Sequence, residues 1–168
     1  MTDGLERNPK VSREALQSLH DDVFGWAMSR CDYDRASAED LVQQAYVELI
    51  SGRARFDGRS SLKSFVFGVV QKLSLRRFRR LAMRLRFASR EDATEPVEDA
   101  PDEGPTDAVW AAVGQLPTRQ RDMIELVFCR ELTIAEASTI MGVSLGTGRV
   151  HYERAKERLR GLLQDERP

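Results

Sequence analysis

The stretch from Leu132 to Arg160, LTIAEASTIMGVSLGTGRVHYERAKERLR, decides the fold of the C-terminal part of this chain. Thr133 can cap a first helix, and Glu136 three residues later can complete a capping box. Gly142 supplies a left-handed residue for a tight turn, and Ser144 is placed to cap a second helix. The stretch therefore predicts a helix-turn-helix.

The second helix of this motif is predicted to have two different faces. Its expected buried stripe consists of Leu145, Gly148, Tyr152, Ala155, Leu159 and Leu162. Its opposite face carries Thr147, Arg149, His151, Arg154, Lys156 and Arg158. Such a helix suits the DNA major groove, where Lys and Arg offset phosphate charge and reach base edges. A helical hairpin with a solvated outer face explains the same pattern, so the motif alone leaves both interpretations open.

Composition predicts a soluble globular protein of the cytoplasm. Apolar residues make up 41% of the 168 residues, and no apolar run approaches the roughly 20 residues of a membrane span, so no membrane insertion is expected. Cys31 and Cys129 lie far apart without a CxxC pattern or flanking histidines, which predicts no metal site and fits a reducing compartment. Both cysteines are expected to be buried on apolar helical stripes.

The net charge of −1 conceals two opposed regions. The segment 88–107, ASREDATEPVEDAPDEGPTD, holds eight acidic residues and one arginine and so carries −7, which leaves the other 148 residues at +6. Its low apolar content cannot offset the entropy of ordering it. We therefore expect an acidic disordered linker over residues 87–107, a flexible N-terminus over 1–11, and two domains over 12–86 and 108–168.

Apolar periodicity predicts three main helices in the first domain. Ser12 is expected to cap the first helix. The apolar face of this helix is expected to consist of Leu16, Leu19, Val23, Phe24, Ala27 and Cys31. The second is expected to begin near Ser37, with Asp40 as a capping-box partner and a buried stripe of Leu41, Val42, Ala45 and Leu49. After the loop SGRARFDGRSS, a third helix is expected to bury Leu62, Phe65, Val66, Val69, Val70 and Leu73.

The third helix is expected to end in a run of arginines. Arginine occupies positions 76, 77, 79, 80, 84 and 86. This density exceeds what a solvated face requires, and it favours neutralisation of nucleic-acid phosphates.

The second domain is expected to contain four helices. The first of these helices is short and contains the apolar residues Val109, Trp110, Val113 and Leu116. Pro117 starts the second helix, which is expected to bury Met123, Ile124, Val127 and Phe128. The helix-turn-helix follows. No strand-like alternation appears, so the predicted fold class is all-α, with two small helical domains joined by the linker.

Three stretches in this order, two in the first domain and one in the second, resemble the bacterial sigma factors of the sigma-70 superfamily, in particular the extracytoplasmic-function (ECF) group. SAEDLVQQAYVELI resembles the region 2.2 helix, and FDGRSSLKSFVFGVVQKLSLRRFRR resembles regions 2.3 and 2.4. LPTRQRDMIELVFCRELTIAEASTIMGVSLGTGRVHYERAKERLRGLL resembles region 4. The resemblance covers residues 12–86 and 106–163. It implies an alternative sigma factor that binds core RNA polymerase, directs it to promoter DNA, and is controlled by an anti-sigma factor.

The resemblance also assigns roles to residues of the first domain. Asp40, Gln43 and Gln44 would dock on the coiled coil of the largest polymerase subunit. The −10 element would be read and opened by Phe56, Asp57, Arg59, Ser60, Ser61, Phe65 and Lys72, because an extruded base needs a pocket and a separated strand needs cations. Phe56 is expected to be an exposed aromatic, whereas Phe65 and Phe67 also fit the core. The backbone of the upstream DNA would be followed by Arg76, Arg77, Arg79 and Arg80.

In the second domain, the resemblance implies that five residues face the major groove of the −35 element: Thr147, Arg149, Val150, His151 and Arg154. Arg119 and Arg121 would contact DNA phosphates. Gly148 replaces the usual branched apolar residue, which implies a helix that is either less rigid or more closely packed. Glu153 would either repel phosphate or accept a bond from a cytosine amino group. Lys72 and Arg76 replace common Asn and Asp, so the −10 specificity is expected to differ from that of a typical member.

Two other functions remain open at this stage: an autonomous helix-turn-helix DNA-binding regulator, and a sigma mimic that sequesters an anti-sigma factor. No catalytic constellation is visible, because His20 and His151 lie in different domains without a spaced acid or nucleophile. Neither an enzyme nor a cofactor is therefore expected.

Overall fold

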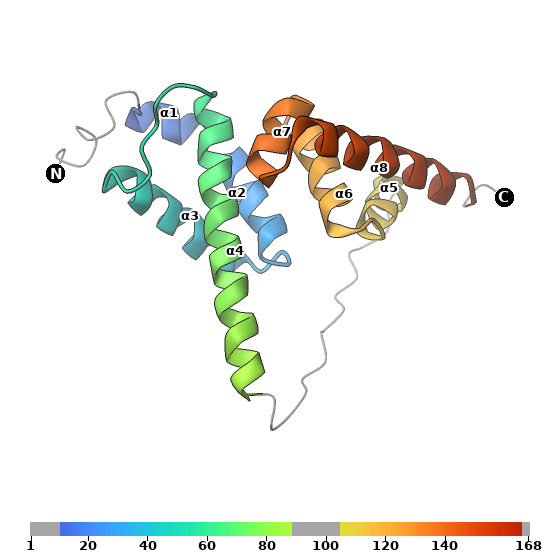
Figure 1. Cartoon of the computed structure of the whole chain (residues 1–168), viewed down its shortest axis with the longest axis horizontal. Helices are drawn as coiled ribbons and strands as arrows, with labels where there is room; N and C mark the ends of the chain where they lie inside the picture. The colour runs from blue at the N-terminus through green and yellow to red at the C-terminus, as the bar shows by residue number, and fades with distance from the viewer. Residues whose placement is uncertain (1–10, 89–104, 166–168) are drawn as a thin grey trace. The chain divides into compact units, whose positions relative to one another are not determined.

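The computed structural model describes residues 11–88 and 105–165, and these fold into helices without any strand. The chain divides into two compact units, residues 1–90 and 91–168, which are coloured blue to green and yellow to red in Figure 1. The predicted fold class, all-α with two small helical domains, is confirmed. Residues 1–10 of the predicted N-terminal tail and residues 89–104 of the predicted linker lie outside the described residues. The predicted bounds are wrong at the edges, because Val11 is buried and residues 87–88 and 105–107 belong to helices.

The first predicted helix is two helices, α1 (Arg13–Ser18) and α2 (His20–Arg30). Ser12 caps α1 as predicted, its hydroxyl accepting from the Ala15 N–H at 3.1 Å. The expectation of one continuous helix is wrong, because the chain breaks at Leu19. The Ser18 hydroxyl donates to the Ala15 carbonyl at 2.8 Å, and such local side-chain bonds compete with continuation of a helix.

Helix α3 (Arg35–Ile50) begins earlier than predicted. Its cap is Asp34, whose carboxylate accepts from the Ser37 N–H at 2.9 Å. Ser37 is therefore inside the helix and not its cap, and Asp40 is exposed on the helix surface instead of closing a capping box. A cap accepts from the N–H two or three residues further on, so Asp34 satisfies the Ser37 N–H and starts the helix one turn earlier than a Ser37 cap would.

Asp34 makes the stability of the N-terminal unit depend on pH. Hydrogen bonds from Ser37 lower the pKa of the Asp34 carboxyl. A lowered pKa in the folded state adds stability above the pKa of the unfolded state, about 3.9, and this stability is lost as the pH falls through the folded-state value. We expect Asp34→Asn to lower the thermal midpoint at neutral pH, and this difference to vanish in acid.

Thermal unfolding followed by circular dichroism from neutral pH to below pH 4 measures this effect. Asp32→Asn removes the same charge from a residue that caps no helix, and serves as the control. If the thermal midpoint of Asp34→Asn is lowered by the same amount at every pH, the charge-based explanation is contradicted.

Helix α4 (Leu62–Ala88) packs against both α2 and α3 and completes the core of the N-terminal unit. Trp26 and Phe67 are fully buried and stack with ring centroids 6.0 Å apart. Val66, Val69, Val70 and Leu73 are buried as predicted, whereas Leu62 and Phe65 are only half-buried. The second half of α4 continues well past the ends of α2 and α3 (Figure 1).

The C-terminal unit contains α5 (Pro105–Gly114), α6 (Thr118–Ile124), a π-helical turn η2 (Glu125–Cys129), α7 (Ile134–Met141) and α8 (Leu145–Asp165). In η2 the Arg130 N–H donates to the Glu125 carbonyl at 3.1 Å, five residues back. A π turn shifts the side chains that follow it around the axis. This explains why Phe128, predicted to be buried, is 60% exposed, while Leu126 is fully buried.

The local signals of the helix-turn-helix are confirmed. The Thr133 hydroxyl accepts from the Glu136 N–H, and the Glu136 carboxylate accepts from the Thr133 N–H, which completes the capping box. Gly142 has a φ of 67°, in the left-handed region. The Ser144 hydroxyl accepts from the Thr147 N–H at 3.1 Å at the start of α8.

Other predictions of burial in this unit hold only in part. Val113, Leu116, Ile124 and Ala155 form a buried cluster against which Tyr152 and Leu159 pack. Val109, Trp110 and Leu145, predicted to be buried, are each more than two-fifths exposed. Leu145 is the first residue of α8, and Val109 and Trp110 lie in the middle of α5 on a side of the helix that is left exposed.

The two cysteines are half-buried and unbonded, not fully buried as predicted. Burial raises the pKa of both the Cys31 and the Cys129 thiols. They are therefore protonated at neutral pH, and their weak nucleophilicity fits small hydrophobic residues.

Candidate functional site

A groove of about 490 Å³ lies on the surface of the N-terminal unit between α2 and α3. Asp40 and Gln43 line it from α3, and His20 and Phe24 line it from α2. Both Asp40 and Gln43 are exposed, as is Gln44 on the same helix, outside the lining of the groove. The structure therefore brings two of the three predicted docking residues to one concave surface.

The groove is held together by contacts across its two walls. His20 Nδ1 lies 3.1 Å from the Tyr46 hydroxyl, and burial raises the pKa of Tyr46, so that this hydroxyl remains neutral. The Arg35 guanidinium lies 5.6 Å from the Phe24 ring and pairs with Glu39 at 2.9 Å. The local pattern of α3 could not show these α2 partners, since His20 and Tyr46 are 26 residues apart.

The loop before α4 uses several of the predicted −10 residues for its own structure. Phe56 is half-buried and packs on Phe65 at 5.2 Å between centroids, so it is not the freely exposed aromatic that was expected. The Asp57 carboxylate accepts from the Arg59 backbone N–H at 3.0 Å and pairs with its side chain at 3.2 Å. Ser61, exposed like Ser60, accepts from the Ser64 N–H at the start of α4.

The predicted cationic face of α4 is largely exposed. Lys72, Arg76, Arg79 and Arg80 are all exposed, and their spacing of four, seven and eight residues puts them on one side of the helix. Arg77 differs, because it donates to the Ser37 carbonyl at 3.2 Å and to the Ser37 hydroxyl at 3.1 Å. Arg77 thus ties α4 to the start of α3, a role that was not predicted.

The outer face of α8 carries the predicted −35 residues. Thr147, Arg149, Val150 and Arg154 are exposed and His151 is half-buried. The Thr147 hydroxyl lies 2.9 Å from that of Ser144. On α6, Arg119 is exposed and Arg121 half-buried. Glu153 pairs with Lys156 at 3.0 Å, so its negative charge on this face is partly offset.

Gly148 of α8 lies directly against Ser138 of α7. A Cβ at this position would lie 1.8 Å from the Ser138 hydroxyl oxygen, 3.0 Å from the Ser138 Cβ and 3.2 Å from the Met123 methyl. Of the two explanations for this glycine, close packing is confirmed. Ser138 is buried, and its hydroxyl donates to the Ile134 carbonyl at 2.6 Å.

The described residues, 11–88 and 105–165, show neither a helix with the length and apolarity of a membrane span nor a cluster of three potential metal ligands. What they show is a helical unit with a polar groove and a cationic helix, and a second helical unit with a cationic recognition helix. This arrangement is that of a two-domain all-helical protein with a helix-turn-helix, a motif typical of DNA-binding proteins.

Family comparison makes this class specific. Residues 15–84 match the family model for sigma-70 region 2, and residues 106–159 match the model for sigma-70, region 4. Together the two matches cover most of the chain, and they occur in the predicted order. The chain belongs to the sigma-70 family.

Relatives along the whole length include ECF sigma factors. The ECF RNA polymerase sigma factor SigF of Caulobacter vibrioides is 28% identical, over 95% of this chain and 89% of its own. The RNA polymerase sigma factor CarQ of Myxococcus xanthus is 25% identical, over 90% and 92%. The ECF RNA polymerase sigma factor ShbA of Streptomyces griseus is 27% identical, over 95% and 91%.

Two solved structures share the fold. The sigma factor RpoE of Bartonella quintana, crystallised with the anti-sigma factor NepR, aligns with a TM-score of 0.73 and 22% identity, over 92% of this chain and 98% of that one. CnrH, in complex with the cytosolic domain of CnrY, aligns with a TM-score of 0.62 and 21% identity, over 99% and 100%.

Proposed function

We propose that this chain is an alternative sigma factor of the ECF group, which binds core RNA polymerase and directs it to promoters. The observation that carries the proposal is the presence of regions 2 and 4, in order, in one chain, each with an exposed cationic helix. The chain would work in the cytoplasm as an initiation factor and would itself catalyse no reaction.

The two units divide this task. In the region 2 domain, residues 12–86, the α2–α3 groove with Asp40 and Gln43, together with Gln44, docks on the core enzyme. Lys72, Arg76, Arg79 and Arg80 contact promoter DNA at and upstream of the −10 element, where cations offset phosphate charge. In the region 4 domain, residues 108–168, Arg149 and Arg154 on α8 contact the −35 element, where arginine reads base edges.

The −10 loop residues have a more limited role in this proposal. Phe56, Asp57, Arg59, Ser60 and Ser61 shape the loop before α4 through the contacts described above. The half-buried Phe56–Phe65 pair then forms one wall for an extruded base, which stacks on aromatic side chains. Arg119, Arg121, Thr147, Val150 and His151 complete the −35 surface.

An anti-sigma factor is the proposed regulator. Relatives named ECF sigma factors match 95% of the chain, and the sigma factor RpoE, which shares this fold, was crystallised with the anti-sigma factor NepR. The acidic segment 87–107 is proposed as the linker that lets the two domains engage separate promoter elements.

Run-off transcription with purified core polymerase and a promoter library tests the function. A sigma factor yields promoter-specific products and binds duplex DNA weakly by itself. An autonomous regulator would instead bind a specific duplex tightly in a gel shift without core enzyme. A sigma mimic would bind an anti-sigma factor and give no product, so absence of any product would refute the proposal.

The docking surface has its own test. We expect Asp40→Lys to weaken binding to core polymerase and to reduce run-off transcription by about tenfold or more, because charge reversal at an interface places like charges together. Glu14→Lys, the same change at an exposed position on α1, should leave both unchanged. Normal core binding by Asp40→Lys would place the docking surface elsewhere.

A further inference from the structure

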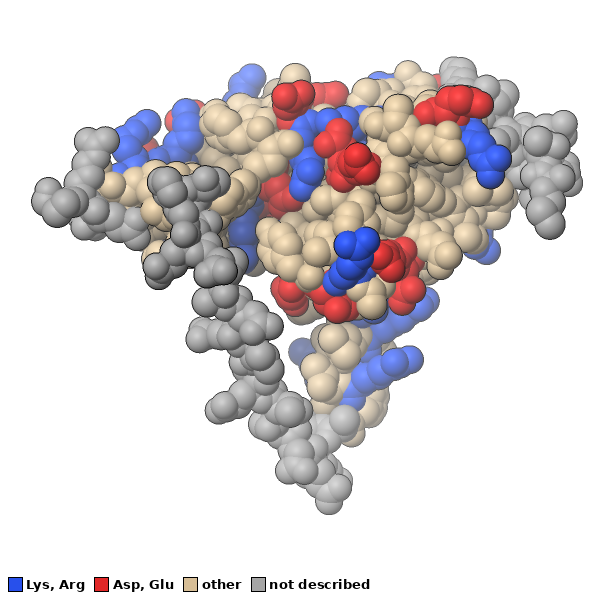
Figure 2. Space-filling view, turned by 180° about the vertical axis from the view of Figure 1, so that it is seen from behind, with Lys and Arg blue, Asp and Glu red and all other residues tan. Residues whose placement is uncertain are grey.

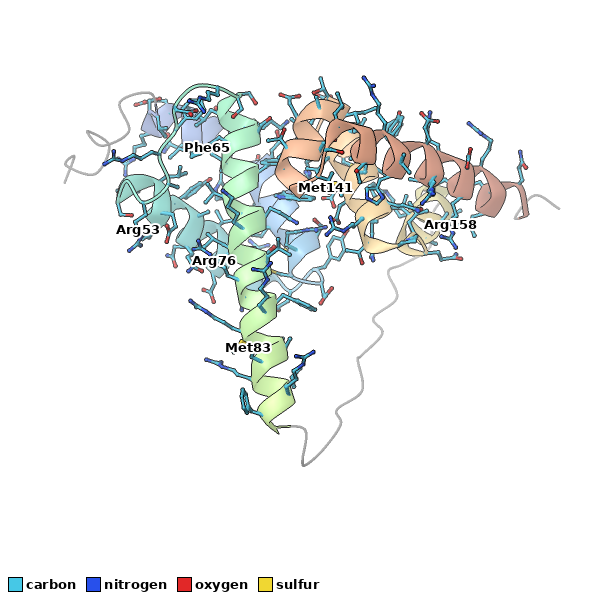
Figure 3. All side chains as sticks on the ribbon, viewed as in Figure 1. Arg53, Phe65, Arg76, Met83, Met141 and Arg158 are labelled. Atoms are coloured by element: carbon cyan, nitrogen blue, oxygen red, sulfur yellow. The ribbon has the colours of Figure 1, made fainter. Side chains whose placement is uncertain are left out.

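The second half of α4 exposes large apolar side chains. Phe78 is 70% exposed, and Leu75, Leu81 and Leu85 are 43%, 54% and 58% exposed. In this part of the helix, side chains radiate from the ribbon on all sides, with the labelled Met83 among them (Figure 3). Within the described part of the N-terminal unit, no other helix extends alongside this half of α4 (Figure 1).

These residues share one side of the helix. Leu75, Phe78, Ala82 and Leu85 are spaced by three, four and three residues, and Leu81 borders them. We call this set the α4 stripe. Counting back by helical spacing leads from Leu75 to Gln71 and Phe67, and Phe67 stacks on Trp26 of α2. The stripe therefore prolongs the face that α2 covers, beyond the end of α2 at Arg30.

The α4 stripe is bordered by positive charge on both edges. Helical spacing places Arg79 and Arg86 along one edge and Arg84 along the other, where Arg77 keeps its charge while it donates to Ser37. No Asp or Glu occurs between residues 75 and 87. At the projecting end of α4, Figure 2 shows Lys and Arg side chains beside residues that carry no charge. An occupant of the stripe must therefore be apolar at its centre and acidic at its edges.

Other occupants fit this pattern less well. DNA would satisfy the arginines but not the Leu and Phe side chains, which gain free energy only when apolar surface is buried. A second copy of α4 would bring arginines against arginines along both edges. The stripe begins where α2 ends beside α4, and a flat membrane surface cannot fit closely into this angle between the two helices. A partner helix can pack there in the same position as α2, further along α4.

We propose that the α4 stripe docks an amphipathic helix of a partner protein whose apolar face is flanked by Asp and Glu. This surface is separate from the α2–α3 groove, and it adjoins the cationic face proposed for DNA, with which it shares Arg79. The proposal goes beyond the proposed function and does not depend on it, because its test uses neither polymerase nor DNA.

The probe is a fluorescein-labelled designed helical peptide with Leu at heptad positions a and d and Glu at e and g. Fluorescence anisotropy with the full chain should show saturable binding, weakened about tenfold or more by Phe78→Glu. Met83→Glu makes the same charge change at a similarly exposed site outside the stripe, and should alter affinity by no more than about twofold. Circular dichroism verifies that both variants are folded.

Four outcomes would overturn the proposal. The first is that the Glu peptide does not bind, and the second is that a matched peptide with Lys at e and g binds equally well. The third is that Phe78→Glu and Met83→Glu lose affinity equally, and the fourth is that a different molecule occupies the α4 stripe. Phe78-dependent binding to phosphatidylglycerol vesicles without peptide binding would indicate a membrane surface. Phe78-dependent dimerisation in sedimentation would indicate a second copy.

Discussion

Replacing Gly148 with valine is expected to destabilise the C-terminal unit by about 2–3 kcal/mol. The new Cβ would lie 1.8 Å from the Ser138 hydroxyl oxygen and 3.0 Å from the Ser138 Cβ, so α7 and α8 must separate or Ser138 must turn and lose its bond to Ile134. The gain in helix propensity over glycine, below about 1 kcal/mol, is too small to compensate. Hydrogen exchange of α7 and α8 peptides across a urea series measures the loss.

Two further variants test the stated cause. Adding Ser138→Ala to Gly148→Val removes the oxygen at 1.8 Å, and we expect it to recover a substantial part of the stability. Gly161→Ala places a methyl group on the same helix where nothing lies within 4 Å, and should stabilise by up to about 1 kcal/mol. Full stability of Gly148→Val alone would show that the helices can separate without cost.

Replacing Arg130 with methionine is expected to destabilise the same unit by about 3 kcal/mol. Arg130 pairs with Glu125 at 3.1 Å, and the two side chains are only 18% and 9% exposed. Removal of one member of a largely buried pair takes the opposite charge away from the other member, which costs more than the pair contributes. The same exchange experiment, read on α6 and η2 peptides, measures the effect.

The double variant Glu125→Leu/Arg130→Met removes both charges and should be more stable than Arg130→Met alone. Arg35→Met breaks an exposed pair with Glu39, in which the side chains are 77% and 57% exposed, and should cost at most about 0.5 kcal/mol. If Arg130→Met lowers the free energy of unfolding no more than Arg35→Met does, the buried pair of Arg130 and Glu125 contributes little to stability.

Local signals in the sequence were sufficient wherever one segment satisfies its own backbone. The capping box of Thr133 and Glu136, the left-handed Gly142 and the Ser144 cap all involve neighbours in the chain, and all are confirmed. The same holds for the all-α class and for the cationic face of α4. These features depend on helical period and on charge, which can be read from one continuous segment of the sequence.

Features that depend on what packs against a segment could not be predicted this way. The period of the first helix continues through Leu19, but side-chain competition breaks it there. The π turn moves Phe128 outward although its spacing is that of a core residue. The partners of the α2–α3 groove, His20 and Tyr46, come from distant positions in the chain.

The sequence by itself determined the two helical domains, their order, their charged faces and the family to which the chain belongs. Only the tertiary structure decided why residue 148 is glycine, which arginine ties α4 to α3, and where apolar side chains remain uncovered. The physical reason is that capping and periodicity act within about one or two helical turns. Burial, steric contact and ion pairing instead depend on which distant surfaces meet.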